Sequence, residues 1–130
     1  MWDIRTSQCV STFYGHKNAV NSVKFNIRGD RIVSSDCDGI TKIWDVRMVK
    51  QEMQFDSGLT SANCALFDKS CSYVYVASED NSIKIFNVLN GEKEGELKGG
   101  HDDSVLDLCW DNSADGYLLS ASADCSFRLW

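Results

Sequence analysis

Residues 32–47 form the stretch that most constrains the fold of this chain. They read Ile-Val-Ser-Ser-Asp-Cys-Asp-Gly-Ile-Thr-Lys-Ile-Trp-Asp-Val-Arg. Two runs rich in β-branched residues flank Asp38-Gly39, a dipeptide that adopts the positive φ angles of a tight hairpin turn. The ending Trp44-Asp45 has counterparts at intervals of 42, 42 and 44 residues, namely Trp2-Asp3, Phe86-Asn87 and Trp130. Such a period indicates a chain built from copies of one supersecondary unit.

Each unit has the pattern of four short antiparallel strands. Short alternating runs follow one another, helical periodicity is absent, and the chain contains no proline. Together these features predict an all-β fold made of propeller blades and disfavour a sandwich or barrel. The expected strands are residues 1–3, 8–14, 19–26, 32–35, 40–45, 51–55, 64–67, 73–78, 82–88, 92–97, 105–110, 118–122 and 127–130, with turns at 28–30, 90–91 and 115–116.

A Gly-His pair before a unit and Trp-Asp at its end resemble the WD repeat (WD40) family. The narrower resemblance is to the C-terminal blades of the sperm-associated-antigen WD-repeat proteins of the ciliary central apparatus. It is carried by the runs Cys9–His16, Ala19–Phe25, Lys42–Arg47 and Ser126–Trp130. This resemblance implies a structural or assembly component of the microtubule pair at the centre of motile cilia and flagella.

Three units cannot close a ring, because propellers use about four to eight blades. The units are expected at residues 1–14 (the end of a preceding blade), 15–57, 58–99 (degenerate) and 100–130 (lacking its last strand). The chain is therefore expected to be an open arc belonging to a longer protein, which the family resemblance makes seven-bladed. Exposed blade faces should make the chain associate with itself when it is produced alone.

Two sets of residues match the structural tetrad of the WD-repeat family. In that family the loop histidine contacts the turn aspartate and, through a strand serine, the indole of the tryptophan. The matching residues are His16, Ser34, Asp38 and Trp44 in one unit, and His101, Ser120, Asp124 and Trp130 in another. A hydrolase triad is the alternative, but the set occurs twice and no nucleophile elbow accompanies it. We therefore predict a structural role and no catalytic residue.

The middle unit departs from this pattern. Leu59 stands where histidine is expected, Val76 replaces the serine, and Phe86-Asn87 replaces Trp-Asp, so that only Asp80 remains. Loss of all polar partners together can be nearly neutral. This blade is expected to pack through apolar contacts.

Composition excludes several other functions. The net charge of −6 argues against nucleic acid as a partner, although residues 1–54 carry 8 basic and 6 acidic side chains. The six cysteines include no Cys-x-x-Cys pair, so we expect free, mostly buried thiols and neither a metal nor a cofactor. No apolar run is long enough for a membrane span and no signal peptide is recognisable, which indicates a cytoplasmic protein.

Partner proteins are expected to contact the inter-blade loops and tight turns. The candidates there are Lys17, Asn18, Cys37, Glu79, Asp102, Asp103 and Ala123. Arg47, in one of two Trp-Asp-x-Arg copies, resembles the residue by which many WD-repeat proteins dock on the adaptor of a cullin-RING ubiquitin ligase. Three function classes remain open: a cytoskeletal scaffold of cilia, a general adaptor such as a ligase substrate receptor or signalling platform, and an enzyme.

Overall fold

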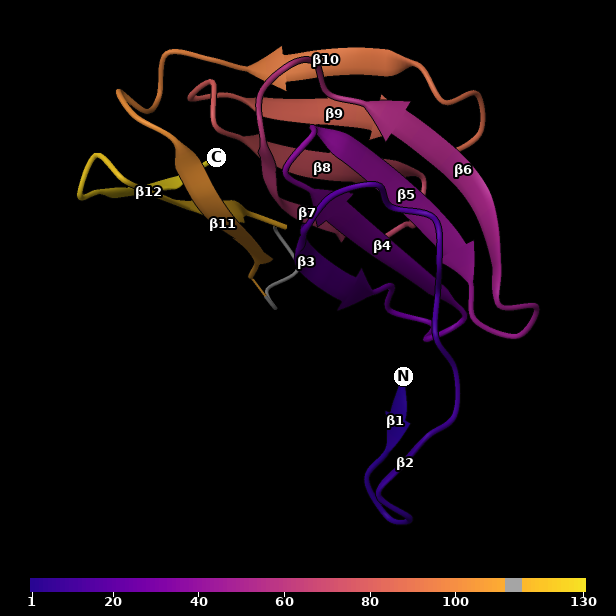
Figure 1. Ribbon diagram of the computed structural model, residues 1–130. Helices are drawn as coiled ribbons and strands as arrows, with labels where there is room; N and C mark the ends of the chain where they lie inside the picture. Colours follow the sequence, from indigo (N-terminus) through magenta and orange to yellow (C-terminus); the bar gives the residue numbers. More distant parts are fainter. Residues whose placement is uncertain (112–115) are drawn as a thin grey trace.

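Thirteen β-strands and no helix make up the part of the chain that the computed structural model describes, residues 1–111 and 116–130 (Figure 1). Each strand pairs antiparallel with the strand that follows it in its own sheet, so every sheet is a simple meander. One four-stranded sheet contains β3 (Val20–Phe25), β4 (Arg31–Asp36), β5 (Ile40–Asp45) and β6 (Lys50–Asp56). The next contains β7 (Ala62–Phe67), β8 (Tyr73–Ser78), β9 (Ile83–Asn87) and β10 (Lys93–Leu97).

A three-stranded sheet and a short ribbon complete the described part. The sheet contains β11 (Val105–Trp110), β12 (Leu118–Ser122) and β13 (Phe127–Leu129), and the ribbon contains β1 (Trp2–Asp3) and β2 (Gln8–Cys9). Figure 1 shows the three sheets arranged as neighbouring blades, with the ribbon projecting away from them. The all-β propeller-fragment architecture predicted from the sequence is confirmed.

The first strands of the three sheets, β3, β7 and β11, lie side by side. Two asparagines 42 residues apart connect them. Asn21 Nδ2 donates to the carbonyl of Ala62 at 3.1 Å, and Asn63 Nδ2 donates to the carbonyl of Val105 at 2.9 Å. Each amide satisfies a carbonyl of the neighbouring blade, so the repeat of the sequence becomes a repeat of the inter-blade contact.

Apolar side chains fill the space between neighbouring sheets. Between the two four-stranded sheets, Phe55 stacks on Phe86 at a centroid distance of 5.1 Å, and Ile43 and Val76 are fully buried beside them. A second cluster, which includes Ile83 and Leu108, lies between the middle sheet and the three-stranded one. Contacts between neighbouring blades thus contribute to the stability of each blade, as expected for repeat architectures.

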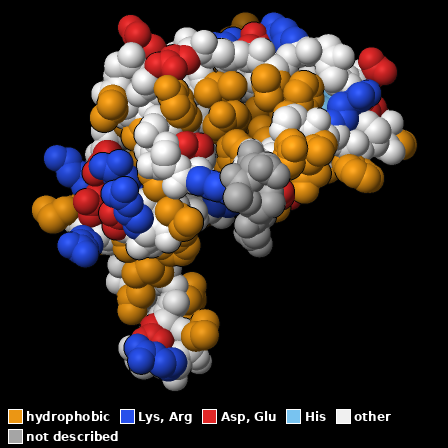
Figure 2. All heavy atoms as spheres, turned by 180° about the vertical axis from the view of Figure 1, so that it is seen from behind, with side chains coloured by type: hydrophobic (Ala, Val, Ile, Leu, Met, Phe, Trp, Pro, Cys, Tyr) orange, Lys and Arg blue, Asp and Glu red, His pale blue; other side chains and the backbone are white. Residues whose placement is uncertain are grey.

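The two outer faces of the arc are apolar and exposed. Val23 and Phe25 of β3 are exposed at one end, and Phe127 and Leu129 of β13 at the other. Seen from behind, hydrophobic side chains gather across the blades and along the projecting ribbon (Figure 2). These patches are the surfaces that a further blade would bury.

Two expectations from the sequence need correction. The predicted strand 8–14 is wrong beyond Cys9, because residues 10–14 pair with no neighbouring strand among the described residues. The cysteines are free, as expected, but most are not buried. Only Cys64 is buried, whereas Cys9, Cys37, Cys109 and Cys125 are exposed. The predicted turn 115–116 falls partly outside the described residues, since Asp115 lies in the segment 112–115.

Candidate functional site

A chain of hydrogen bonds joins three side chains of the first four-stranded sheet to His16, in the segment before β3. Trp44 Nε1 on β5 donates to Ser34 Oγ on β4 at 2.8 Å, and Ser34 Oγ lies 2.6 Å from His16 Nε2. His16 Nδ1 lies 2.6 Å from Asp36 Oδ2. An indole can only donate and a carboxylate can only accept. One direction therefore satisfies all four groups: Trp44 to Ser34, Ser34 to His16, and His16 to Asp36, with the imidazole hydrogen on Nδ1.

The aspartate of this network is Asp36, and the assignment of Asp38 to it is wrong. Alternate residues of a strand share a face, so Asp36 lies on the same side of β4 as Ser34 and is 1% exposed. Its second oxygen accepts the backbone N–H groups of Asp38 and Ile40 at 3.0 and 2.9 Å. Asp38 lies past the end of β4, where its carboxylate accepts from Asn18 Nδ2 at 2.8 Å. The spacing Ser-x-Asp along a strand is the signal that could have identified Asp36.

The three-stranded sheet holds an equivalent network. His101 lies 2.8 Å from Asp124 through Nδ1 and 2.7 Å from Ser120 through Nε2, and Trp130 Nε1 donates to Ser120 Oγ at 2.8 Å. Here the structure brings together all four residues proposed for this unit. The carboxylate comes from the turn because Ser122 occupies the position of Asp36, and its hydroxyl donates to the carbonyl of Asp103.

Electrostatics fix the charge of Asp124. The hydroxyl of Ser126, the ring of His101 and backbone N–H groups donate to its carboxylate. The Ser126 hydrogen bond, together with that of His101, outweighs burial and lowers the pKa of Asp124 well below its ordinary value of 3.8. The carboxylate is held ionised as a hydrogen-bond acceptor.

A glycine precedes each histidine because the tryptophan ring packs against it. A Cβ atom on Gly15 would lie 3.2 Å from Cη2 of Trp44, and one on Gly100 would overlap the ring of Trp130. The two residues of the Gly-His pair therefore have different structural roles. The glycine admits the indole, and the histidine links the serine to the carboxylate.

The middle sheet has a different polar network, which the sequence analysis missed. Lys84 of β9 is 5% exposed. Its Nζ lies 2.6 Å from Asp80 Oδ2 and 3.3 Å from Ser78 Oγ, and it also donates to the carbonyl of Ser57. Thr60 Oγ1 lies 2.9 Å from the same serine hydroxyl. The expectation that this blade packs through apolar contacts is confirmed by Val76 and Phe86, which lie in the core. The network around Lys84 adds buried polar contacts beside them.

The lysine sets the charge of Asp80. Burial raises the pKa of this carboxyl group, but hydrogen bonds from Lys84, Ser82 and Ser78 outweigh burial and hold the pKa at about 2, against an ordinary value of 3.8. A buried ammonium group needs such partners, since an unpaired buried charge is strongly destabilising. Lys42, one repeat earlier, donates instead to Gln51 Oε1 at 2.6 Å.

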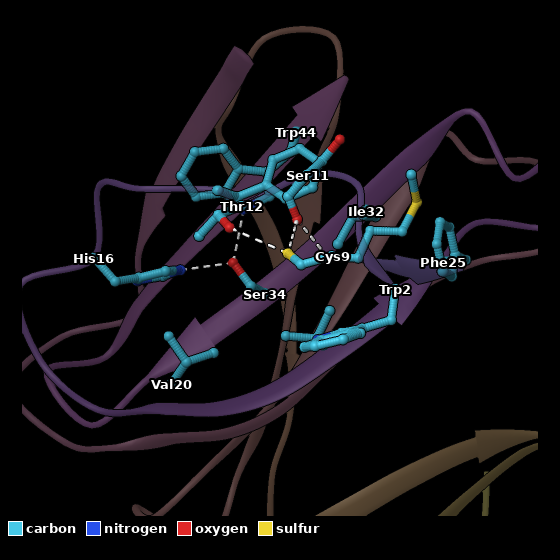
Figure 3. Close-up of a pocket in the computed structure, with 13 residues that line it drawn as sticks. Trp2, Cys9, Ser11, Thr12, His16, Val20, Phe25, Ile32, Ser34 and Trp44 are labelled. Carbon is cyan, nitrogen blue, oxygen red and sulfur yellow. Dashed lines mark hydrogen bonds between the residues drawn. The ribbon is translucent and has the colours of Figure 1, made fainter. Parts of the chain in front are cut away.

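A cavity of about 540 Å³ adjoins the first network, so a ligand could reach Ser34 from it. Figure 3 shows His16, Ser34 and Trp44 at this cavity, together with apolar residues such as Trp2 and Val20. The Ser34 oxygen is held between the indole N–H and the imidazole. A nucleophilic serine needs a free lone pair and donors for an oxyanion. The arrangement is that of a structural link, and the same link recurs at Ser120.

The eight proposed partner-contact residues are all exposed. Seven of them lie at one end of the blades, where the tight turns contact the inter-blade loops. In each blade a turn residue donates a backbone hydrogen bond to the loop that leads into the first strand of that blade, β3, β7 or β11. The matching backbone bonds run from Cys37 to Ala19, from Glu79 to Ser61 and from Ala123 to Ser104, at 3.1, 3.0 and 3.0 Å. Arg47 lies at the opposite end, on the turn between β5 and β6.

Among residues 1–111 and 116–130 there is no cluster of three or more His, Cys, Asp or Glu side chains that could hold a metal ion. Over that same part of the chain, no helix has the length and apolar character needed to cross a bilayer.

Repeated antiparallel sheets, two of them with a Trp-Ser-His-Asp hydrogen-bond network inside the blade, define a segment of a β-propeller. The family described as "WD domain, G-beta repeat" matches residues 7–45, 53–87 and 91–130. The chain therefore belongs to the WD40 repeat family.

Similar proteins come from several functional contexts. The chain is 28% identical to the guanine nucleotide-binding protein subunit beta of Oryza sativa subsp. indica, over 100% of this chain and 37% of that protein. It is 26% identical to the serine-threonine kinase receptor-associated protein of Gallus gallus, over 96% and 35%. It is 30% identical to the pre-mRNA-processing factor 19 homolog 2 of Arabidopsis thaliana, over 75% and 18%. The chain thus spans little more than a third of the first two relatives.

Proposed function

We propose that this chain is part of a non-enzymatic scaffold that binds other proteins. The observation that carries the proposal is that the Ser, His and Asp side chains are bonded to one another and to a tryptophan in two separate blades. In both blades the serine oxygen is bonded to the tryptophan indole as well as to the histidine, which supports a structural role for these groups. What remains accessible is a set of loops and turns held by rigid sheets, which is the usual arrangement of a binding surface.

The names of the relatives support an adaptor role in general terms. They concern a G-protein subunit, a receptor-associated protein and a pre-mRNA-processing factor. Such different contexts on one fold are expected when the fold supplies a platform and the loops supply the specificity.

For the location of the protein, we propose the central apparatus of motile cilia or flagella. The support is the resemblance of the runs Cys9–His16, Ala19–Phe25, Lys42–Arg47 and Ser126–Trp130 to a ciliary WD-repeat family. None of the three relatives named above refers to a cilium, so this part of the proposal stands on the resemblance alone. Its partners would be central-apparatus or microtubule-associated proteins.

An adaptor of a cullin-RING ubiquitin ligase is the second candidate function. The observation in its favour is Arg47, which is exposed on the β5–β6 turn, two residues after Asp45. In the part of the chain that the structure describes, Arg47 makes no ion pair. A free guanidinium at this position is available to a partner protein.

Detergent extraction of ciliated cells that express the tagged protein separates these candidates. Retention of the tag on the central microtubules supports the axonemal location, and loss of the tag into the soluble fraction contradicts it.

Proximity labelling in the same cells tests the scaffold role. Charge reversal at Asp102 and Asp103 should remove labelled neighbours, whereas Arg47→Ala should remove a ligase adaptor if the second function holds. Hydrolysis of an ester substrate that disappears in Ser34→Ala and Ser120→Ala would overturn the non-enzymatic proposal.

A further inference from the structure

The side chain of Lys24 reaches from the first four-stranded sheet to the three-stranded sheet, past the sheet between them. Lys24 lies on β3, and its Nζ atom donates to Asp107 Oδ1 at 2.9 Å and to the carbonyl of Leu108 at 2.8 Å, both on β11. The intervening strand is β7, which contacts both β3 and β11. Lysine can span this arrangement because its ammonium group is carried on a flexible four-carbon stem. Lys24 therefore links two blades that are not neighbours.

This link belongs to Lys24 and is not part of the repeat. Lys24, Leu66 and Cys109 occupy the same register position on the first strands of the three blades. A leucine side chain has no polar atom, and the thiol of Cys109 contacts the carbonyl of the next residue, Trp110. The asparagine contacts described above join only neighbouring blades. The connection from the first blade to the third is therefore a feature of this sequence and not of the repeated unit.

The link is an ion pair combined with a hydrogen bond to the backbone. Burial lowers the pKa of Lys24, but the hydrogen bond to Asp107 and further favourable interactions outweigh burial and raise the pKa above its ordinary value of 10.5. Burial raises the pKa of Asp107, but hydrogen bonds from Cys64 and Lys24 outweigh it and lower the pKa below 3.8. The side chains of Lys24 and Asp107 are 35% and 66% exposed, so salt should weaken the ion pair.

We propose that Lys24 fixes the first blade directly relative to the third, in addition to the contacts that pass through the middle blade. In repeat proteins each unit normally contacts only its neighbours, so that small motions at successive interfaces add along the chain. A direct link between the first and third units restricts both interfaces at once. It holds the β4–β5 turn at a set separation from the β12–β13 turn. Both turns belong to the end of the blades assigned to partner contacts, a consequence that rests on the proposed scaffold function.

Double electron–electron resonance spectroscopy between two native cysteines tests this link. Cys37 in the β4–β5 turn and Cys125 in the β12–β13 turn are exposed, whereas Cys64 is buried. Three substitutions leave Cys37 and Cys125 as the two thiols open to a spin label: Cys9→Ser, Cys71→Ser and Cys109→Ser. The labelled chain is diluted into unlabelled chain, so that distances between copies do not contribute.

Lys24→Met should broaden the distance distribution about twofold, because motions at the two blade interfaces then add without a direct constraint. Lys24→Arg keeps a cation of similar reach and should keep a width close to that of the parent chain. Lys98→Met is the matched control, since Lys98 is exposed and pairs with Glu96, and it should leave the distribution unchanged. Sodium chloride at about 1 M, where the Debye length is about 3 Å, should broaden the distribution of the parent chain but not that of Lys24→Met.

A Lys24→Met distribution as narrow as that of the parent chain would show that the middle blade alone sets the separation. Equal broadening by salt in the parent chain and in Lys24→Met would also overturn the proposal. If circular dichroism shows that Lys24→Met does not fold, Asp107→Asn replaces it, and its distribution should be broader than that of the parent chain and less sensitive to salt. No partner protein is present in this measurement, so its failure would leave the proximity-labelling test of the scaffold role intact.

Discussion

His16 Nδ1 lies 2.6 Å from Oδ2 of Asp36, a residue on the strand, whereas in the equivalent network His101 meets Asp124, a residue in the turn. The two blades therefore obtain the same carboxylate from positions that differ by two residues relative to the serine. This difference yields a prediction that separates Asp36 from its neighbour Asp38.

Asp36→Asn should lower the free energy of unfolding by about 1 to 3 kcal/mol, because a buried amide cannot replace both the imidazole contact and the two backbone bonds. Asp38→Asn should cost under about 0.5 kcal/mol, because Asp38 is exposed. Urea unfolding followed by tryptophan fluorescence measures both. Equal losses in the two variants would contradict the assignment of Asp36 as the sole carboxylate that holds His16.

Lys84→Met should destabilise the chain by about 1 to 3 kcal/mol. The substitution keeps most of the side-chain volume but leaves three oxygen acceptors, on Asp80, Ser78 and Ser57, without their donor. Lys98→Met, at an exposed lysine paired only with Glu96, is the control and should have little effect. A Lys84→Met variant as stable as the parent chain would mean that the blade tolerates a purely apolar interior.

Acid should remove the contribution of Asp80. Its pKa is lower in the folded chain, about 2, than its ordinary value of 3.8. The carboxylate therefore stabilises the fold fully above the ordinary value, and this stabilisation is lost as pH falls through that value towards 2. Because solvent screens a carboxylate that is about one-third exposed, we expect a loss of about 1 kcal/mol. Unfolding curves of Asp80→Asn should show a weaker decline than the parent chain over the same pH range.

The sequence predicted the strands well because each blade repeats one hydrophobic alternation. The strands Ile40–Asp45, Tyr73–Ser78 and Val105–Trp110 lie where the pattern placed them. The second tetrad was expected from the resemblance to the WD-repeat family, and its four residues are hydrogen-bonded to one another. The family pattern pointed to Asp38 in the turn, whereas Asp36 holds His16 because it shares a strand face with Ser34.

No sequence motif predicts the hydrogen-bond network around Lys84. Its members come from the end of β8, from β9 and from the loop between β6 and β7. A lysine on a strand predicts exposure in most proteins. Only the approach of the Ser57 carbonyl and the Asp80 turn shows that this one is buried.

Gly39→Ala should be among the most damaging single substitutions in the chain. Gly39 has a φ of +79°, and an added Cβ atom would lie too close to the carbonyl oxygens of Gly58 and Thr60. Backbone strain and this overlap together should cost more than about 2 kcal/mol. Gly29→Ala is the matched control, since Gly29 has a similar φ of +70° but open space around it. Thermal unfolding that ranks the two variants equally would show that the φ angle alone, without the overlap, sets the cost.

Self-association of the isolated chain should depend on its two apolar ends. Val23 and Phe25 are exposed on β3, and Phe127, 79% exposed, lies on β13, so both outer sheets present faces that a neighbouring blade would bury. Light scattering after gel filtration should give a mass above 14.6 kDa for the parent chain. Val23→Lys with Phe127→Lys should return the mass towards that of the monomer, whereas Leu59→Lys, at a fully exposed site on a loop, should not. A parent chain that runs as a monomer would show that the open faces are not sufficient to drive association.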